Sequence, residues 1–133
     1  MANPEHLQIL KQGVEAWTKW RKDDKWVTRP DLRGADLRGA DLRKAHLRGA
    51  DLWLTDLRGA DLREADLREA DLGRADLWRA DLHGADLRRA HLRQANLARV
   101  DLREANLAGA SLGEANLRES ILGFIQNACK IRS

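Results

Sequence analysis

The sequence predicts an all-β solenoid, in which short extended segments turn a corner after every fifth residue. A leucine recurs at every fifth position from Leu32 to Leu122, which makes 19 positions without an exception. Two residues before each leucine stands a small side chain, which is Ala at 15 of these positions. The residue in between is Asp at 12 positions and Asn at three. One regular pattern therefore extends over residues 30–124.

A period of five residues excludes the two common regular structures. In an α-helix each five-residue step would rotate by about 140°, which spreads the leucines around the helix. On a straight strand an odd period sends successive leucines to opposite faces. A short extended piece followed by a corner places Ala35 and Leu37 inside and Asp36 outside. Gly often stands at the corner, but Glu64 and Glu69 occupy equivalent positions, so we expect that the corner does not require a positive φ in every repeat.

The repeats resemble the pentapeptide repeat family, whose unit is Ala-Asp/Asn-Leu-X-X. The copies ADLRG at 35–39, ADLRE at 60–64 and ANLAR at 95–99 carry this resemblance. It implies a right-handed quadrilateral parallel β-helix of about five coils, with four repeats per coil. Residues 20 positions apart would then stack, about 4.8 Å apart as neighbouring strands do. The segment before the repeats is similar to that of cyanobacterial members.

The segment 1–29 is expected to cover the open top of the first coil. Asn3 is a good N-cap and Pro4 suits the first helical position, which predicts one helix from about Pro4 to Arg21. Apolar residues recur on it at helical spacing, namely Leu7, Leu10, Val14 and Trp17. We expect Trp20 and Trp26 to pack along the same cover. The alternative is that this amphipathic helix docks on a partner or a membrane.

At the other end, Ile121, Phe124 and Ile125 stand where the repeat places polar residues or has ended. Two interpretations remain open for this end. Residues 125–133 form a second cap or tail, or the apolar side chains form a weak tail-to-tail homodimer, as in some relatives.

Composition and charge narrow the class of protein. The formal net charge is +3, but residues 30–124 carry 16 basic and 17 acidic side chains, so the repeat body is nearly neutral. No apolar stretch approaches the roughly 20 residues that span a bilayer. The first residues lack the pattern of a secretory signal. The single Cys129 forms no internal disulfide. These features predict a soluble, cytoplasmic protein without a membrane partner.

The chemistry-bearing residues do not suggest an enzyme. His46, His83 and His91 fall on different sides of the predicted coils, so we expect no metal site. Ser111 and Ser120 have no evident His–Asp pair beside them. Carboxylates on a convex, solvated surface lack the pocket that acid–base catalysis needs. We therefore expect neither catalytic activity nor a cofactor.

One group of outward residues breaks the monotony of the repeats and is a candidate binding patch: Trp53, Leu54, Arg58, Trp78 and Arg79. Trp and Arg are the residue types that anchor protein interfaces. The alternative is local stacking, with Trp78 on Arg58 and Trp53 on Arg33.

These observations favour a non-catalytic repeat scaffold that binds an as yet unidentified protein through its outer faces. Two alternatives follow from the family and from the arginines. Some relatives imitate DNA and occupy a type II topoisomerase, but this requires a long, strongly negative rod. The Arg-rich first coils suggest a surface for nucleic acid or another polyanion, which the interspersed aspartates disfavour.

Overall fold

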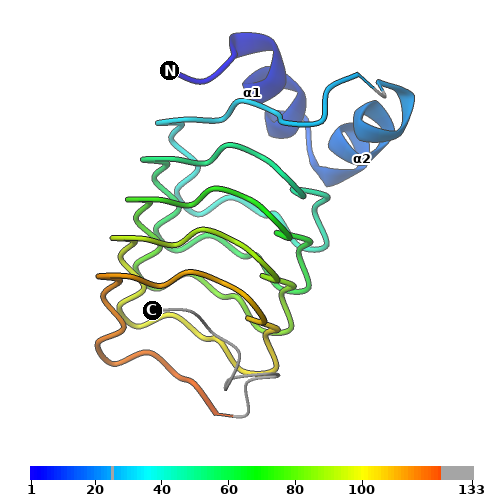
Figure 1. Cartoon of the computed structure of the whole chain (residues 1–133). Coiled ribbons are helices and arrows are strands. Elements are labelled where there is room, and N and C mark those ends of the chain that lie inside the picture. Colours follow the sequence, from blue (N-terminus) through cyan, green and yellow to red (C-terminus); the bar gives the residue numbers. More distant parts are fainter. Residues whose placement is uncertain (25, 124–133) are drawn as a thin grey trace.

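The computed structural model describes residues 1–24 and 26–123, and it shows two short helices lying over a stack of coils (Figure 1). Helix α1 spans Pro4–Lys11 and helix α2 spans Val14–Asp23. From Asp31 onward, each five-residue repeat contains one bridging residue followed by a turn. Phe124, Ile125 and the rest of the predicted C-terminal segment lie outside the described residues.

Parallel β-bridges join residues that are 20 positions apart, from Asp31↔Asp51 to Asp101↔Ile121. In each bridge the leucine N–H donates to the coil that follows, as from Leu52 N to Asp71 O at 2.7 Å. The return bond runs from Asp71 N to Ala50 O at 2.9 Å. The register of 20 confirms that four five-residue repeats separate one stacked position from the next. Because each extended piece is so short, the ladder consists of isolated bridges instead of long strands.

The turns correct one expectation from the sequence. The corner residue has a positive φ in glycine and non-glycine repeats alike, with 66° at Gly34, 58° at Glu64 and 60° at Glu69. The prediction that the corner does not require a positive φ in every repeat was wrong for the described repeats. Two bonds hold this geometry, because Glu64 N donates to His83 O at 3.0 Å and Ala65 N donates to Leu62 O at 3.0 Å. The stacked coils thus impose a left-handed conformation that costs a non-glycine residue about 1 kcal/mol or more.

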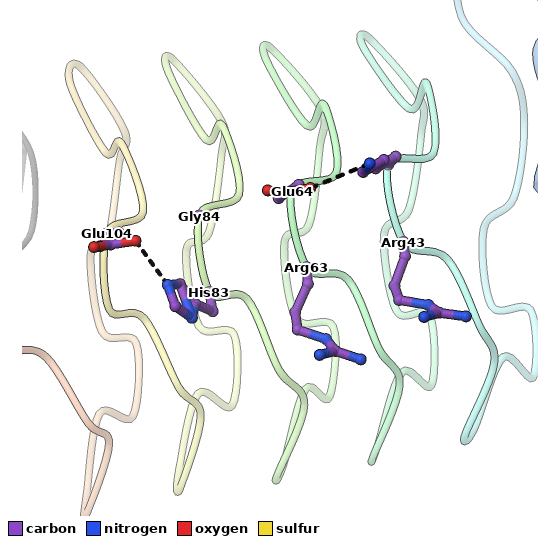
Figure 2. A pocket seen from close by; sticks show the side chains of 7 residues that line it. Arg43, Arg63, Glu64, His83, Gly84 and Glu104 are labelled. Atoms are coloured by element: carbon purple, nitrogen blue, oxygen red, sulfur yellow. Dashed lines mark hydrogen bonds and ion pairs between the residues drawn. The ribbon is translucent and has the colours of Figure 1, made fainter.

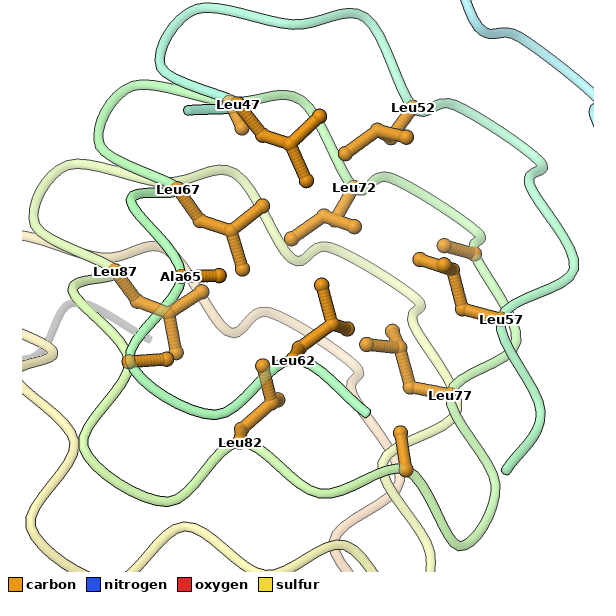
Figure 3. Packing of buried hydrophobic residues seen from close by; sticks show 14 of the residues in the cluster. Leu47, Leu52, Leu57, Leu62, Ala65, Leu67, Leu72, Leu77, Leu82 and Leu87 are labelled. Atoms are coloured by element: carbon orange, nitrogen blue, oxygen red, sulfur yellow. The ribbon is translucent and has the colours of Figure 1, made fainter. Parts of the chain in front are cut away.

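The leucines fill the interior as stacked ladders (Figure 3). Leu47, Leu67 and Leu87 lie one above another, and each has no exposed surface. The alanines two residues earlier are also buried, and their small size leaves room for the leucines. Thr55 is the polar exception at such a position, and its hydroxyl donates to the carbonyl of Leu52 and, at 3.3 Å, to that of Leu32. A buried hydroxyl is tolerated here because it is hydrogen-bonded.

The cap consists of two helices, so the prediction of one continuous helix was wrong. Gly13 separates them with φ of 116°, a conformation that disfavours any residue with a Cβ atom. The predicted start is confirmed, since Asn3 Oδ1 accepts from Glu5 N at 2.9 Å. Leu10 and Trp17, one from each helix, are buried against the first coil. The break at Gly13 allows both helices to lie over the top of the stack (Figure 1).

The cap also supplies hydrogen bonds that the first coil would otherwise lack, because no coil precedes it. Asp31 N donates to His6 Nδ1 at 3.0 Å. Trp17 Nε1 donates to His46 O at 2.8 Å. The lid therefore covers the leucines and satisfies part of the exposed ladder edge.

The tryptophans of the N-terminal segment divide into two kinds. Trp20 packs in the cover, with its ring centroid 4.9 Å from that of Trp17. Trp26 is 93% exposed, so the prediction that it packs along the cover was wrong. It lies after the end of α2, beyond the reach of the helical pattern that orients the other two.

Candidate functional site

The outward Asp and Asn side chains shape the turns. Asp36 Oδ1 accepts a hydrogen bond from the backbone N–H of Arg38 at 3.2 Å. Asn96 Oδ1 accepts from Ala98 N at 3.1 Å in the same way. Such a bond to the backbone two residues ahead is a turn that Asp and Asn form readily. The residue types at this position therefore reflect local turn chemistry.

The same aspartates form ion pairs with the arginine two residues later. Arg38 donates to Asp36 through Nε at 2.8 Å and through Nη2 at 2.7 Å. Every Asp-Leu-Arg repeat in residues 26–123 contains this pair. The contact to the neighbouring coil is longer, with 3.7 Å between Arg38 Nε and Asp56 Oδ2. The arginines therefore neutralise the aspartates mainly within one repeat.

These pairs hold the carboxyl pKa values below their usual range. Hydrogen bonds from the Arg43 side chain and backbone lower the pKa of Asp41 to about 2. Arg38 lowers the pKa of Asp36 in the same way.

Acidification is expected to destabilise the rod. A carboxyl whose pKa is depressed by folding contributes stability above its unfolded-state pKa, near 4. That contribution is lost as the pH falls toward the folded-state value, about 2 for Asp41. Urea denaturation at pH 7, 5, 3 and 2 should show a midpoint that is nearly constant to pH 5 and then decreases. Asp41→Asn should reduce this decrease, and a midpoint unchanged down to pH 2 would contradict the prediction.

The candidate patch contains the large apolar side chains that are exposed away from the two ends of the described chain. The exposed fractions are 40% for Trp53, 48% for Leu54 and 39% for Trp78. Leu54 stands at the corner between the side that holds Trp53 and the side that holds Arg58 and Trp78. The three apolar residues therefore interrupt a surface that is otherwise made of paired charges.

Trp53 lies over the backbone of Gly73, which is 20 residues later and therefore on the next coil. A Cβ atom at Gly73 would lie 2.9 Å from Trp53 Cδ1, so only glycine leaves room for this indole. The expected stacking on Arg33 is not the arrangement found, because the Arg33 guanidinium binds Asp31 at 3.0 Å.

The cation on Trp78 is Arg79, whose guanidinium carbon lies 4.6 Å from the ring centroid. The expected partner Arg58 instead binds Asp56 through Nη2 at 2.6 Å. Local cation–π stacking therefore occurs, but with a different arginine. The ion pair within its own repeat holds Arg58 more strongly than an exposed ring would.

A hollow of about 500 Å³ opens beside Trp53, on the side of the rod that holds Asp71 and His91. Its lining consists of Trp53, Asp71, Gly73, Arg74, His91, Arg93, Gln94 and Ser111. Apart from Trp53, the candidate patch did not include these residues. One signal was present in the sequence, since Gly73 stands 20 residues after Trp53 at a position that usually holds Arg. The register of 20 places a gap beside the indole.

Asp71, His91 and Ser111 follow one another in this column, joined by bridges between successive coils. Ser111 therefore has His91 beside it on the preceding coil, and Asp71 lies one coil further away. Their side chains nevertheless form no hydrogen bond with one another within the described residues. Asp71 Oδ1 instead accepts from Gly73 N at 2.9 Å. The row thus lacks the contact between nucleophile and base by which a hydrolytic triad is recognised.

A second hollow, of about 380 Å³, lies on another side of the rod (Figure 2). There His83 Nε2 lies 2.8 Å from Glu104 Oε2. Arg63 and Glu64, on the neighbouring coil, also line the hollow. Residues 1–24 and 26–123 contain no cluster of three or more His, Cys, Asp or Glu side chains arranged to hold a metal ion. Neither described helix is long and apolar enough to cross a membrane.

The fold and its surface define a repeat solenoid: parallel coils, a buried leucine ladder, and turns formed by outward Asp and Asn. The family model for pentapeptide repeats matches residues 31–63, 60–97 and 85–123. The chain belongs to the pentapeptide repeat family, whose members fold as right-handed quadrilateral β-helices.

Solved structures of cyanobacterial pentapeptide repeat proteins are similar to this chain. Rfr23 from Cyanothece 51142 is 37% identical, with a TM-score of 0.50 over 68% of this chain and 63% of its own. HetL from Nostoc sp. strain PCC 7120, described as involved in heterocyst differentiation regulation, is 31% identical, with a TM-score of 0.49 over 71% and 59%. The protein alr5209 from Nostoc PCC 7120 is 34% identical, with a TM-score of 0.38 over 86% and 83%.

The chain spans about three fifths of the length of Rfr23 and of HetL. No protein with a curated description matches it.

Proposed function

We propose that this chain is a non-catalytic scaffold that binds another protein through the surface around Trp53, Leu54 and Trp78. The observation that carries the proposal is the exposure of these three side chains, at 40%, 48% and 39%, in the middle of a rod whose other outward side chains are mostly paired charges. The proposal takes the rod to have about five coils of four repeats. A rigid rod positions such residues without the loss of conformational freedom that a flexible loop would incur on binding.

The charge distribution supports a protein partner over the other two candidates. An imitation of DNA needs a strongly negative face, but the aspartates of each Asp-Leu-Arg repeat are paired with arginine. A polyanion surface needs an extended track of unpaired cations, and the same pairs neutralise the first coils.

Replacing both exposed tryptophans, Trp53→Ala with Trp78→Ala, is expected to weaken partner binding by at least about thirtyfold, since a central Trp contributes about 2 kcal/mol or more at an interface. The partner is first isolated with the full chain from the source cell, and its Kd is then measured by calorimetry. Trp26→Ala is the matched control, because Trp26 is exposed but lies at the capped end. Equal affinity of the double variant and the wild type would contradict the proposal.

A further inference from the structure

Arg93 differs from the arginines of the Asp-Leu-Arg repeats. Those arginines bind the aspartate two residues earlier, but His91 occupies that position before Arg93. The Arg93 guanidinium forms no ion pair or hydrogen bond with any residue in the described part of the chain. The side chain is exposed and lines the hollow beside Trp53. A single replacement in the repeat pattern therefore leaves one cation unpaired next to an exposed indole.

His91 lies where two hollows meet. One is the hollow beside Trp53, and the other, of about 640 Å³, is lined by Arg29, Glu69, Arg89, His91 and Gly109. The Arg89 side chain also lacks an ion pair among the described residues. The Arg74 guanidinium, at the edge of the hollow beside Trp53, donates among the described residues only to the neutral side chain of Gln94, at 2.7 Å.

The carboxylates of the same region are already engaged. Asp71 accepts from Gly73 N and lies 3.6 Å from Arg29 Nη2. Glu69 lies 3.1 Å from Arg48 Nη2. The surface around His91 therefore carries a local excess of positive charge, while the Asp-Leu-Arg repeats around it are neutralised.

We propose that this surface binds an acidic segment of a partner protein, with carboxylates at Arg93 and Arg89 and an apolar side chain against Trp53. The inference rests on the scaffold function proposed above and specifies the chemistry of its partner. Charge complementarity selects an acidic ligand, and the indole selects one that also carries an apolar group. A nucleic acid would need phosphate contacts over a longer track than these few arginines provide.

Restoring the repeat pattern should abolish the site. His91→Asp places a carboxylate two residues before Arg93, where the same spacing produces a bidentate pair in every Asp-Leu-Arg repeat described. Asn116→Asp is the matched control, since Asn116 also precedes an arginine, Arg118, at this spacing but lies on another side of the rod. Both variants introduce an Asp at the same position of the repeat, and each adds one negative charge.

The probes are a fluorescein-labelled peptide of ten Glu and Asp residues around one Phe, its Gln and Asn counterpart, and a ten-nucleotide oligothymidine. We expect the acidic peptide to bind the wild-type chain at least about tenfold more tightly than its amide counterpart, as charged hydrogen bonds of this kind allow. Fluorescence anisotropy should show at least a fivefold loss for His91→Asp and less than a twofold change for Asn116→Asp.

Three results would overturn the proposal: equal binding of the two peptides, equal losses in the two variants, or tighter binding of the oligothymidine with the same dependence on His91. Circular dichroism checks that the variants fold. If one does not, Arg93→Gln against Arg103→Gln replaces the pair, because Arg103 is bound to Asp101. If the peptide test fails while partner binding still depends on Trp53 and Trp78, the acidic assignment is wrong and the scaffold function stands.

Discussion

Leu67→Ala is expected to lower the free energy of unfolding by about 2–5 kcal/mol. Leu67 has no exposed surface and is stacked between Leu47 and Leu87 (Figure 3). The coils cannot close around the cavity, because Leu67 N donates to Asp86 O at 2.8 Å and Leu47 N donates to Asp66 O at 2.8 Å. Each coil is thus held at a fixed height above the next, and the lost methyl groups leave a void.

Chemical denaturation followed by circular dichroism measures this effect. Leu122→Ala is the control at the same repeat position, and because Leu122 is 43% exposed it should cost less than about 1 kcal/mol. A similar loss at both positions would show that the ladder is not the main source of stability. A loss only at Leu67 would also agree with the general behaviour of repeat proteins, whose stability is the sum of contacts between neighbouring repeats.

Trp17→Ala is expected to cost about 3–5 kcal/mol, as large aromatic truncations in a core do. Trp17 is fully buried and packs on the first coil, so its removal exposes the top of the leucine ladder. It also leaves His46 O without the bond from Trp17 Nε1. Trp17→Phe separates the two contributions, because it keeps most of the apolar surface and should cost about 1–3 kcal/mol for the lost bond and the smaller ring.

Hydrogen exchange adds a positional test of the cap. In Trp17→Ala the amides of the first coil, such as Leu32 N, should exchange faster than those near Leu67, since openings in a solenoid begin at an unprotected end. Trp26→Ala should change the stability by less than about 0.5 kcal/mol, because Trp26 is 93% exposed. A large effect at Trp26, or none at Trp17, would contradict the role of the two helices as a lid.

Much of the candidate surface could be predicted from the sequence, but the contacts between its residues could not. The pattern shows directly that Trp53, Leu54 and Trp78 replace the usual outward residues, and all three are exposed. It does not show that Arg79, instead of Arg58, covers Trp78. That choice depends on competition between an ion pair within a repeat and a ring contact, and the spacing of the residues is the same in either case.

The hollow beside Trp53 was missed for a related reason. Gly73 and Arg93 do not stand out within their own repeats, and they become neighbours of Trp53 only because 20 residues make one coil. The resemblance to the family supplied this register, so the column was available in principle. Predicting the hollow would have required recognising that the missing side chain at Gly73 leaves space beside Trp53 on the adjacent coil.

The sequence by itself determined the repeating core. A leucine at every fifth position with a small residue two places before it can be buried only if the chain bends in each repeat, and this is a local property of the pattern. The tertiary structure decided the φ of the corners, the break at Gly13 and the exposure of Trp26. These features depend on hydrogen bonds and contacts between coils or with the cap, which no single repeat contains.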